Sequence, residues 1–326
     1  MLRAGIIGAG RMAWGYDAGK WDDASTGFTI ASCLNRHPAV QLEAIYDPVP
    51  QAREAFRAGY KGEGPVALFD NLDAFFAAEL DLVAIASPSE HHFLHLNKCL
   101  DAGIERLWVE KPVTIALADF DAIEQRVAAM AVQPRICVNF VRRGLPEIQR
   151  LKEYIASSPD TPEAMAIEIR YSRKLAVNGV HLLDALGAVT GANNAPKKPD
   201  YVIPSASGNP SFGVTVSGIP VSLAGFDLPY HLIEMAVIDS RGRMLLTAGA
   251  TRLTWEPSEP NPDHAGFSRM GASESVAGMS GDLQAAALNI LGSLIDGSKP
   301  PIAPLQSARF SQGLMDVVLG TGRSEN

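Results

Sequence analysis

The chain has 326 residues, of which 47% are hydrophobic and 20% charged, and its formal net charge is −8. This length suggests about two domains, and the composition is that of a folded globular protein rather than a disordered one. The acidic balance argues against non-specific binding to nucleic acid, which needs a basic surface. No apolar run approaches the length of a membrane span. Because the first residues already have a strand pattern, we also expect no signal peptide.

Three cysteines, Cys33, Cys99 and Cys137, lie far apart in the sequence. An odd and sparse set does not predict a disulfide framework. We expect these residues to be small buried hydrophobes in a reducing compartment, and therefore a cytoplasmic protein.

Strand-like and helix-like segments alternate through the N-terminal part of the chain. This alternation predicts an α/β domain with a doubly wound parallel sheet. The stretch from Tyr16 to Arg36 adds a loop and a helix between the first two strands. The predicted strands are Leu2–Ile7, Val40–Tyr46, Leu82–Ala86, Leu107–Val109 and Arg135–Phe140, and the predicted helices are Pro50–Ala58, Leu72–Ala78, Glu90–Ala102 and Ala116–Met130.

The pattern changes after Phe140, which places the domain boundary between residues 1–141 and 142–326. A helix over Leu145–Ile155 is followed by strand-like runs from Tyr201 to Trp255 with almost no helix between them. These runs predict a mostly antiparallel sheet in an α+β domain. We further expect a long loop over Glu256–Gly281 and two closing helices, near Asp282–Ile295 and Pro304–Leu319.

The most informative motif, Gly8-x-Gly10-x-x-Ala13, directly follows the first strand. Gly8 permits a tight turn, Gly10 lets a pyrophosphate approach the backbone, and Ala13 keeps the following helix close to the sheet. The N–H groups at the start of that helix would face the phosphates, with Arg11 and Met12 beside them. A glycine motif is specific only in this strand–turn–helix context, and here the context is present. The motif therefore predicts dinucleotide binding.

Asp47 ends the second predicted strand, where a carboxylate of this fold reaches the adenosine ribose hydroxyls. A 2′-phosphate at the same place would meet like charge, at a cost of about 4 kcal/mol for unit charges 4 Å apart at an effective dielectric of 20. We therefore expect NAD as the cofactor, with NADP as the alternative. The added loop explains the unusually long spacing from Gly10 to Asp47.

The tripeptide Glu110-Lys111-Pro112 follows another predicted strand. Pro112 disfavours helical geometry at the residue before it, so Lys111 should project from the carboxyl end of the strand. Ligands of open α/β sheets lie beside such ends. A lysine there can hold and polarise a hydroxyl or carbonyl oxygen of a substrate.

Several motifs in chain order resemble those of the Gfo/Idh/MocA family, which includes glucose–fructose oxidoreductase and inositol dehydrogenase. The resemblance covers nearly the whole chain. It implies a Rossmann domain followed by an α+β domain with a large open sheet, and hydride transfer between NAD(P) and a sugar or polyol carbon. The motifs are Gly8-x-Gly10-x-x-Ala13, Asp47, Ser87-Pro88-Ser89-Glu90-His91-His92, Glu110-Lys111-Pro112 and Asn178-Gly179-Val180-His181-Leu182-Leu183-Asp184.

The resemblance also implies roles for individual residues. Lys111 matches the family's catalytic lysine, and His181 matches its proton-transfer histidine, with Asp184 completing that motif. Arg143 falls at the domain junction, and Asn178 joins the implied substrate-binding group of Lys111, Arg143, His181 and Asp184. The implied cofactor-binding residues are Gly8, Gly10, Arg11, Met12, Asp47, Ser87, Pro88, His92, Glu110 and Lys111.

The sequence departs from the family pattern at Val177, where many dehydrogenases carry an aspartate four positions before the motif histidine. Valine cannot accept a proton, and Asn178 could fill part of the role by hydrogen bonding. This departure keeps two alternatives open. One is an NAD-assisted elimination, such as a glycosidase without net redox, and the other is a non-catalytic dinucleotide-binding protein. We expect an enzyme because Lys111 and His181 are both retained.

Other patterns give secondary hypotheses. His91 and His95 have metal-ligand spacing, but no further ligand completes a site and we expect no metal. His264, Phe267 and Arg269 could belong to a lid. Apolar residues on the free face of the second sheet would support a homodimer or homotetramer. A basic group near the expected crevice could grip an anionic substrate or simply be solvated, and it consists of Arg142, Arg143, Arg170, Arg173 and Lys174.

Overall fold

A computed structural model describes residues 1–20 and 27–320. The chain forms two compact units. The first comprises Met1–Gly144 together with Leu283–Ala308, and the second comprises Leu145–Asp282 with the chain from Arg309 onward. A division into 1–141 and 142–326 would assign Leu283–Ala308 to the second unit, whereas the structure groups it with the first. None of the helices in the described ranges is both long and apolar enough to cross a membrane.

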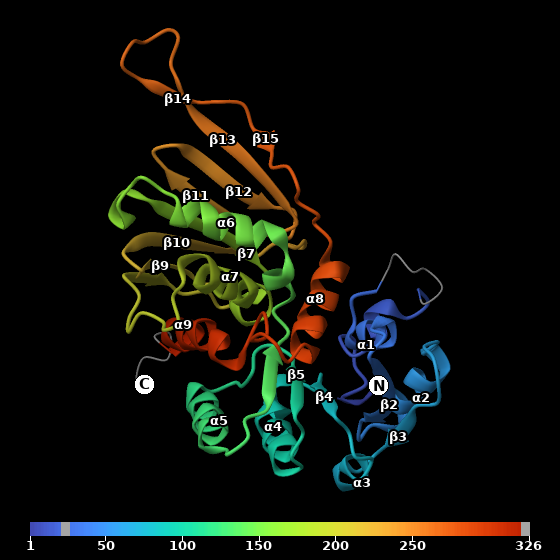
Figure 1. Ribbon diagram of the computed structural model, residues 1–326. Helices are drawn as coiled ribbons and strands as arrows, with labels where there is room; N and C mark the ends of the chain where they lie inside the picture. The colour runs from blue at the N-terminus through green and yellow to red at the C-terminus, as the bar shows by residue number, and fades with distance from the viewer. Residues whose placement is uncertain (21–26, 321–326) are drawn as a thin grey trace. The chain divides into compact units, whose positions relative to one another are not determined.

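The first unit contains a six-stranded parallel sheet in the order β3-β2-β1-β4-β5-β6 (Figure 1). This order reverses between β1 and β4, the point at which ligands of doubly wound sheets bind. The prediction of a doubly wound parallel sheet is confirmed. The strands are β1 (Leu2–Ile7), β2 (Val40–Tyr46), β3 (Ala67–Phe69), β4 (Leu82–Ile85), β5 (Arg106–Val109) and β6 (Arg135–Val138).

The predicted helices of the first unit form within a few residues of their expected limits. The short strand β3 was not predicted, because three residues give no periodic pattern. A further helix, α8 (Leu283–Ile295), packs against β5, β6 and α1 although it comes from near the other end of the chain. The remaining helices are α1 (Ile30–Arg36), α2 (Pro50–Gly59), α3 (Leu72–Phe76), α4 (His92–Asp101) and α5 (Leu117–Ala129).

The second unit contains a large mixed sheet in the order β14-β13-β12-β11-β7-β10-β9-β8, with β15 also paired to β13. Only β7 and β10 run parallel, and the other pairings are antiparallel, as predicted. The central strand β7 was not predicted. The strands are β7 (Ala166–Ser172), β8 (Tyr201–Ile203), β9 (Ser211–Val216), β10 (Ile219–Phe226), β11 (Ile233–Asp239), β12 (Gly242–Thr247), β13 (Arg252–Pro260), β14 (Ser268–Met270) and β15 (Glu274–Ser275).

Helices cover one face of this sheet. In the first of these helices, α6 (Pro146–Ala156), the proline stands in the first turn, where its missing N–H is not needed. The second, α7 (Val180–Thr190), packs against α6 and β11 and is almost entirely buried. The third is α9 (Ala308–Gly320). Alternate residues of β7 face this core, with Ile167, Ile169 and Tyr171 buried.

The segment Glu256–Gly281, expected to be a loop, is partly a hairpin. Strand β13 continues to Pro260 and pairs with β14, so the hairpin extends beyond the neighbouring strands (Figure 1). The prediction of a loop is wrong for these two strands. Their Pro, Ser and Gly content is typical of loops, and the pairing of β13 with β14 joins residues about ten positions apart, which composition does not reveal.

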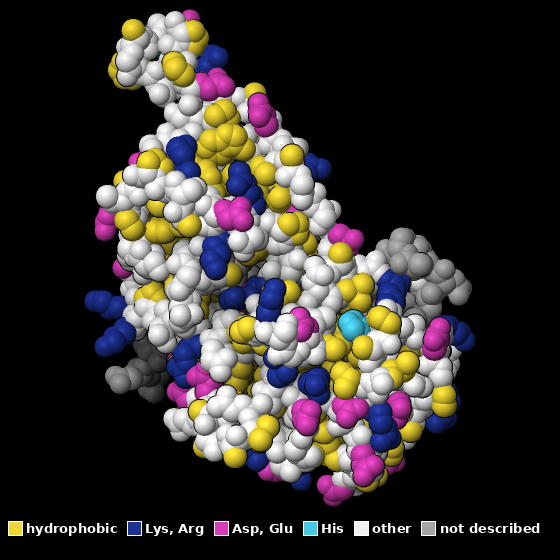
Figure 2. Space-filling model, in the orientation of Figure 1, with side chains coloured by type: hydrophobic (Ala, Val, Ile, Leu, Met, Phe, Trp, Pro, Cys, Tyr) yellow, Lys and Arg dark blue, Asp and Glu magenta, His cyan; other side chains and the backbone are white. Residues whose placement is uncertain are grey.

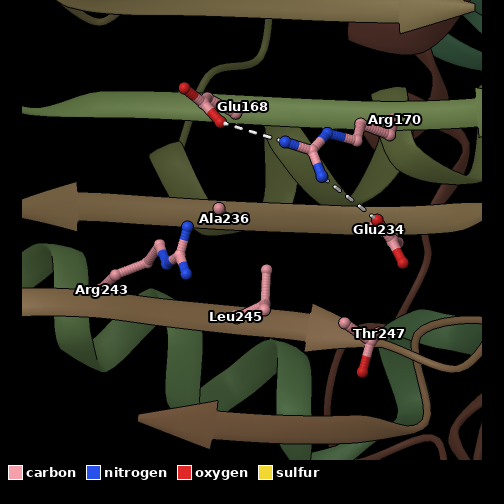
Figure 3. A pocket seen from close by; sticks show the side chains of 7 residues that line it. All are labelled: Glu168, Arg170, Glu234, Ala236, Arg243, Leu245 and Thr247. Atoms are coloured by element: carbon pink, nitrogen blue, oxygen red, sulfur yellow. Dashed lines mark ion pairs between the residues drawn. The ribbon is translucent and has the colours of Figure 1, made fainter. Parts of the chain in front are cut away.

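We expected the helix-free face of the second sheet to be apolar, and the structure contradicts this. A pocket of about 210 Å³ on this face is lined by side chains of β7, β11 and β12 that point away from the helices (Figure 3). Arg170 lies 3.9 Å from both Glu168 and Glu234 within it. Figure 2 shows the opposite side of this sheet, which the helices cover, and acidic and basic side chains are interspersed there as well. The remaining lining residues are Ala236, Arg243, Leu245 and Thr247.

Candidate active site

The glycine turn after β1 has the geometry that a dinucleotide requires. Gly8 has φ of +100°, and a Cβ on it would lie 2.7 Å from the backbone nitrogen of Ser87. A side chain is therefore excluded by both conformation and space. A Cβ on Gly10 would meet no atom within 4 Å, so this exposed residue borders open space. The residues present fit a pyrophosphate lying against the turn.

The helix that follows the turn is interrupted, which the sequence did not predict. Residues 11–14 form a turn, and α1 begins only at Ile30. The Ile30 N–H donates to Met12 O at 3.1 Å, and the Ala31 N–H donates to Ala13 O at 2.8 Å. The helix thus resumes across an inserted segment, residues 14–29. The phosphate-facing N–H donors would be those of Gly10 to Ala13, since the first turn lacks intrahelical acceptors.

Described residues of the insertion are anchored at both ends. The Trp14 indole donates to Ala9 O at 2.9 Å and packs edge-on against Phe56 of α2. The buried Asp17 carboxylate accepts from the Thr29 backbone N–H at 2.9 Å and from its hydroxyl at 2.5 Å. The expected added loop between Tyr16 and Arg36 is present at its described ends, and residues 21–26 of it lie outside the described residues.

Asp47 follows β2 and lies beside the glycine turn. One carboxylate oxygen accepts from the Ala9 N–H at 2.8 Å and the other from the Val49 N–H at 2.9 Å. Each carboxylate oxygen has a second acceptor position, so ribose hydroxyls could still donate to it. Arg53 in α2 donates to the Asp47 carbonyl at 2.7 Å, which fixes the turn that presents the carboxylate.

His92 lies in the interior of the first unit. Its side chain is buried, with Nδ1 2.8 Å from Pro112 O and Nε2 2.8 Å from Ser87 O. A neutral imidazole can donate to only one of these carbonyls at a time. The ring links the turn after β4 to the turn after β5, so this geometry points to a positioning role.

The same turn after β4 holds Ser87 and the exposed Pro88. The Ser87 hydroxyl lies 2.8 Å from Nδ1 of His95. Burial, together with the nearby His91 and His92, lowers the pKa of His95 to about 4. His95 is therefore neutral at neutral pH, and its hydrogen bond with the Ser87 hydroxyl adds no charge to the turn. No group of three or more His, Cys, Asp or Glu with metal-binding geometry occurs in the described part of the chain.

Glu110 is a buried residue that shapes the turn carrying Lys111. Its carboxylate accepts from the Asn139 amide and, at 3.2 Å, from the Lys111 backbone N–H. The Asn139 amide oxygen in turn accepts from the Trp108 indole at 3.1 Å. This buried network ties β5 to the end of β6 and satisfies the polar groups that enclose Glu110.

Lys111 follows Glu110, the first residue after β5, and is half-buried. Burial lowers the pKa of Lys111. The adjacent Glu110 carboxylate opposes this shift, and the positive charge of Arg142 adds to it. A less strongly held proton makes the ammonium group a better proton donor than an ordinary lysine. Burial also lowers the pKa of Arg142 to about 10.

Arg143 lies in the 3-10 turn Val141–Gly144. Its guanidinium approaches Ser307 O at 3.5 Å, a contact made within the first unit.

The second unit carries Asn178, His181 and Asp184 at intervals of three residues. Asn178 lies in a π-helical segment, Lys174–Gly179, which leads directly into α7. Residues three apart share a helix face, so these side chains line one side of the α7 N-terminus. Asn178 and Asp184 are buried and His181 is half-buried.

His231, which the sequence gave no reason to select, contacts this group. Its Nδ1 lies 3.0 Å from the side-chain amide of Asn178, and its Nε2 lies 2.6 Å from the Arg173 guanidinium. Val177, at the position where the family often has aspartate, is 50% exposed. The buried polar contact is therefore made by Asn178 rather than by residue 177. His231 is 53 residues away from Asn178, and no local motif connects them.

The other hypotheses meet varied outcomes. Arg170 does not join Arg173 but lies on the helix-free sheet face between two glutamates. Phe267 is 70% exposed near the hairpin tip, where His264 and Arg269 are exposed as well. The three cysteines are buried free thiols, as predicted, and burial raises the pKa of Cys33 to about 12 and that of Cys137 to about 11.

Comparison with known proteins agrees with this architecture. The sequence model of an oxidoreductase family with an NAD-binding Rossmann fold, Gfo/Idh/MocA, matches residues 2–139. Inositol 2-dehydrogenase of Mycolicibacterium gilvum is 29% identical over 151 residues, which cover 46% of this chain and 38% of that protein. The chain thus matches well under two thirds of the length of this relative.

Solved structures resemble the chain over nearly its whole length. UDP-N-acetylglucosamine 3-dehydrogenase GnnA of Acidithiobacillus ferrooxidans has a TM-score of 0.70 at 19% identity, covering 98% of this chain and 96% of that one. The WlbA dehydrogenase of Bordetella pertussis, in complex with NADH and UDP-GlcNAcA, has a TM-score of 0.73 at 16% identity, covering 99% and 97%. At these identities the likeness establishes the fold of both units.

The glycine turn, the strand order and the matching sequence model all describe one kind of domain. Residues 2–139 are therefore similar in sequence to the NAD-binding Rossmann domain of the Gfo/Idh/MocA oxidoreductase family.

Proposed function

We propose that the protein is an NAD(P)-dependent oxidoreductase that acts on a CH–OH carbon of a small-molecule sugar, sugar acid, nucleotide sugar or polyol. The names of the relatives, inositol 2-dehydrogenase and UDP-N-acetylglucosamine 3-dehydrogenase, support this substrate range. The placement of Lys111 at the end of β5, close to the strand-order reversal between β1 and β4, is the observation that carries the proposal.

The first unit offers the groups that would hold the cofactor. Gly8 and Gly10 leave room for the pyrophosphate, and the Asp47 carboxylate would accept from the adenosine ribose hydroxyls. The negative charge of Asp47 favours NAD over NADP. When bound, the nicotinamide ring supplies the site that accepts or gives the hydride.

Lys111 would act on the substrate oxygen. An ammonium group stabilises the negative charge that develops on an alcohol oxygen during oxidation, and in reverse it protonates the carbonyl. The lowered pKa of Lys111 suits both roles, because its proton is more easily shared than that of a solvated lysine. Glu110 and His92 would hold the two turns that present it.

His181 would remove the hydroxyl proton. Imidazole has an ordinary pKa near 6.5, so it can accept and release a proton around neutral pH. The motif resemblance supports the role of His181 as the proton-transfer group and that of Lys111 as the group that holds the substrate oxygen. Asn178, Asp184 and Arg143 would contribute further substrate contacts, with Asn178 replacing part of the function of the aspartate that is absent at Val177.

Two finer features belong to the proposal. The buried free cysteines favour a cytoplasmic location, where thiols stay reduced. The mixed charges on the helix-free sheet face favour a homo-oligomer, since alternating signs on one patch complement themselves across a two-fold axis. A monomer by light scattering at micromolar concentration would contradict the oligomer.

The deciding experiment is NADH formation or consumption with a panel of sugars, sugar acids, nucleotide sugars and polyols. We expect turnover with at least one class, and about a 10²–10⁴-fold loss in His181→Asn with dinucleotide binding unchanged. Glycoside cleavage without accumulation of NADH would instead identify an elimination with no net redox. Dinucleotide binding with no turnover, unaffected by the substitution, would identify a non-catalytic protein.

A further inference from the structure

The chain between β7 and α7 has an unusual backbone. Arg173 and Lys174 have φ of 63° and 72°, the left-handed region in which residues other than glycine, asparagine and aspartate are uncommon. Such conformations persist only where surrounding contacts fix them, and they concentrate at functional sites. The π-helical segment that begins at Lys174 is another feature often found at such sites.

Backbone contacts hold this strained pair in place. The Lys174 N–H donates to the Asn209 side chain at 2.6 Å, and the Leu175 N–H donates to Gly208 O at 2.8 Å. On the other side, the Ser172 hydroxyl bonds to the backbone that carries His231, donating to Tyr230 O at 2.7 Å. The orientation of residues 173 and 174 is therefore set by two separate loops of the second unit.

These two cations lack acidic partners. Within residues 1–20 and 27–320, neither Arg173 nor Lys174 forms an ion pair with a carboxylate, and both side chains are exposed. Arg170, three residues before Arg173, instead lies 3.9 Å from Glu168 and from Glu234. The chain as a whole has a net charge of −8 and repels anions. Two adjacent cations without acidic partners therefore form a local site where a bound anion gains favourable electrostatic energy.

Arg173 is also connected to the residues that we assign to the substrate. It donates to Nε2 of His231 at 2.6 Å, so that nitrogen must be unprotonated and the proton of the neutral ring resides on Nδ1. Nδ1 of the same ring lies 3.0 Å from the side-chain nitrogen of Asn178. Asn178 in turn shares a helix face with His181.

We propose that Arg173 and Lys174 form an anion-binding subsite for a carboxylate or phosphate of the substrate, aligned with Asn178 through His231. This inference rests on the proposed function for the identity of the ligand as a substrate. Sugar acids carry such a carboxylate and nucleotide sugars carry such phosphates, so both classes of compound would offer an anionic group to this subsite. The fork of the Arg173 guanidinium fits two oxygens of either anion, and Lys174 adds a second charge.

The test is equilibrium binding by titration calorimetry, with the full chain saturated with NADH so that the dinucleotide site is filled and no oxidation occurs. The probes are UDP, D-glucuronate and the neutral D-glucose. The variants are Arg173→Asn and Lys174→Asn, which remove charge while keeping a residue that tolerates left-handed φ. Arg170→Gln, which removes an exposed arginine from β7, the strand that Arg173 directly follows, is the matched control.

We expect at least one anion to bind more tightly than glucose, with an affinity that falls as salt is raised. Arg173→Asn should weaken this binding about tenfold or more, Lys174→Asn less, and Arg170→Gln by less than about twofold. Preference for UDP would assign a phosphate, and preference for D-glucuronate a carboxylate. Thermal unfolding of each variant verifies that the fold is retained.

Binding of neither anion, equal binding of glucose, or equal effects of Arg173→Asn and Arg170→Gln would overturn the subsite. Because no turnover is measured, anion binding through Arg173 stands even if no hydride transfer is found. Conversely, turnover of neutral polyols alone would retain the proposed function and discard the subsite.

Discussion

The two units assemble their candidate functional groups in different ways. In the first unit, each group follows the end of a parallel strand: Asp47 after β2, Ser87 after β4 and Lys111 after β5. In the second unit, side chains from distant segments meet, since Arg173 and His231 are 58 residues apart. Strand order alone brings the first set together, whereas the second depends on how one loop packs on another. Substitutions in the two units should therefore change different properties of the protein.

In the first unit, the largest expected effect is on turnover, from Lys111→Met. Removing a charge that stabilises developing negative charge costs about 10²–10³-fold in kcat. The nearly isosteric methionine should leave the strand end and the affinity for NAD unchanged. Steady-state rates and a cofactor fluorescence titration measure the two quantities. Unchanged kcat would remove Lys111 from the reaction.

A change at Asp239, which is none of the candidate site residues of the second unit, should act on stability instead. Asp239 accepts from Tyr154 at 2.5 Å, from Ser158 at 2.8 Å and from Arg241 at 2.9 Å. Burial by itself would raise the pKa of Asp239, but these hydrogen bonds outweigh it and lower the pKa. Asp239→Asn should lower the free energy of unfolding by about 2–3 kcal/mol in urea denaturation.

The pH dependence of this loss has a definite sign. Because the folded-state pKa of Asp239 is depressed, its contribution is present above the ordinary value of 3.8 and is lost as pH falls through the folded-state value. The difference between wild type and Asp239→Asn should therefore shrink on acidification. Affinity for NAD, which belongs to the first unit, is the control, and a weakened affinity would contradict the division of roles.

A smaller effect is expected from Asp47→Asn. The substitution keeps an acceptor oxygen for the Ala9 N–H and removes the charge that would repel a 2′-phosphate. The ratio of NADP to NAD affinity should rise about tenfold. Fluorescence titrations with both cofactors provide the measurement. An unchanged ratio would show that the carboxylate does not approach the ribose.

The smallest expected effect concerns the alkaline limb of the rate profile. Burial lowers the pKa of Lys111 below its ordinary value of 10.5, so kcat/KM should fall as pH rises through that lowered value. Lys111→Arg keeps its charge at all accessible pH values. It should therefore show a lower rate without this limb, measured from neutral to strongly alkaline pH. A limb retained in the arginine variant belongs to another group.

The sequence predicts the first unit better than the second because its information is local. Buried parallel strands appear as apolar runs, and Gly8, Asp47 and Lys111 stand next to them in the chain. The interruption of α1 escaped prediction because the resumption at Ile30 depends on a hydrogen bond to Met12, outside any continuous period. β7 carries charged residues on its open face, so its pattern lacks a continuous apolar run.

The candidate site shows the same division. The motif residues were identifiable, but the packing of His92 between two backbone carbonyls was not, since no pattern reports what surrounds a ring. His231 was missed for a related reason. A single histidine before a strand has no spacing relative to Asn178 that sequence could reveal, and only the folded sheet brings the two into contact.

The resumption of α1 at Ile30 has a consequence for protein engineering. Two backbone hydrogen bonds join residues 12 and 13 to residues 30 and 31. Ala13 and Ile30 are therefore close in space although 16 residues separate them in the sequence. The two ends of a foreign peptide inserted between Ala13 and Ile30 would therefore lie close together, next to the glycine turn after β1. A reporter domain inserted at this position would lie next to the glycine turn after β1, so its signal should change when a dinucleotide binds there.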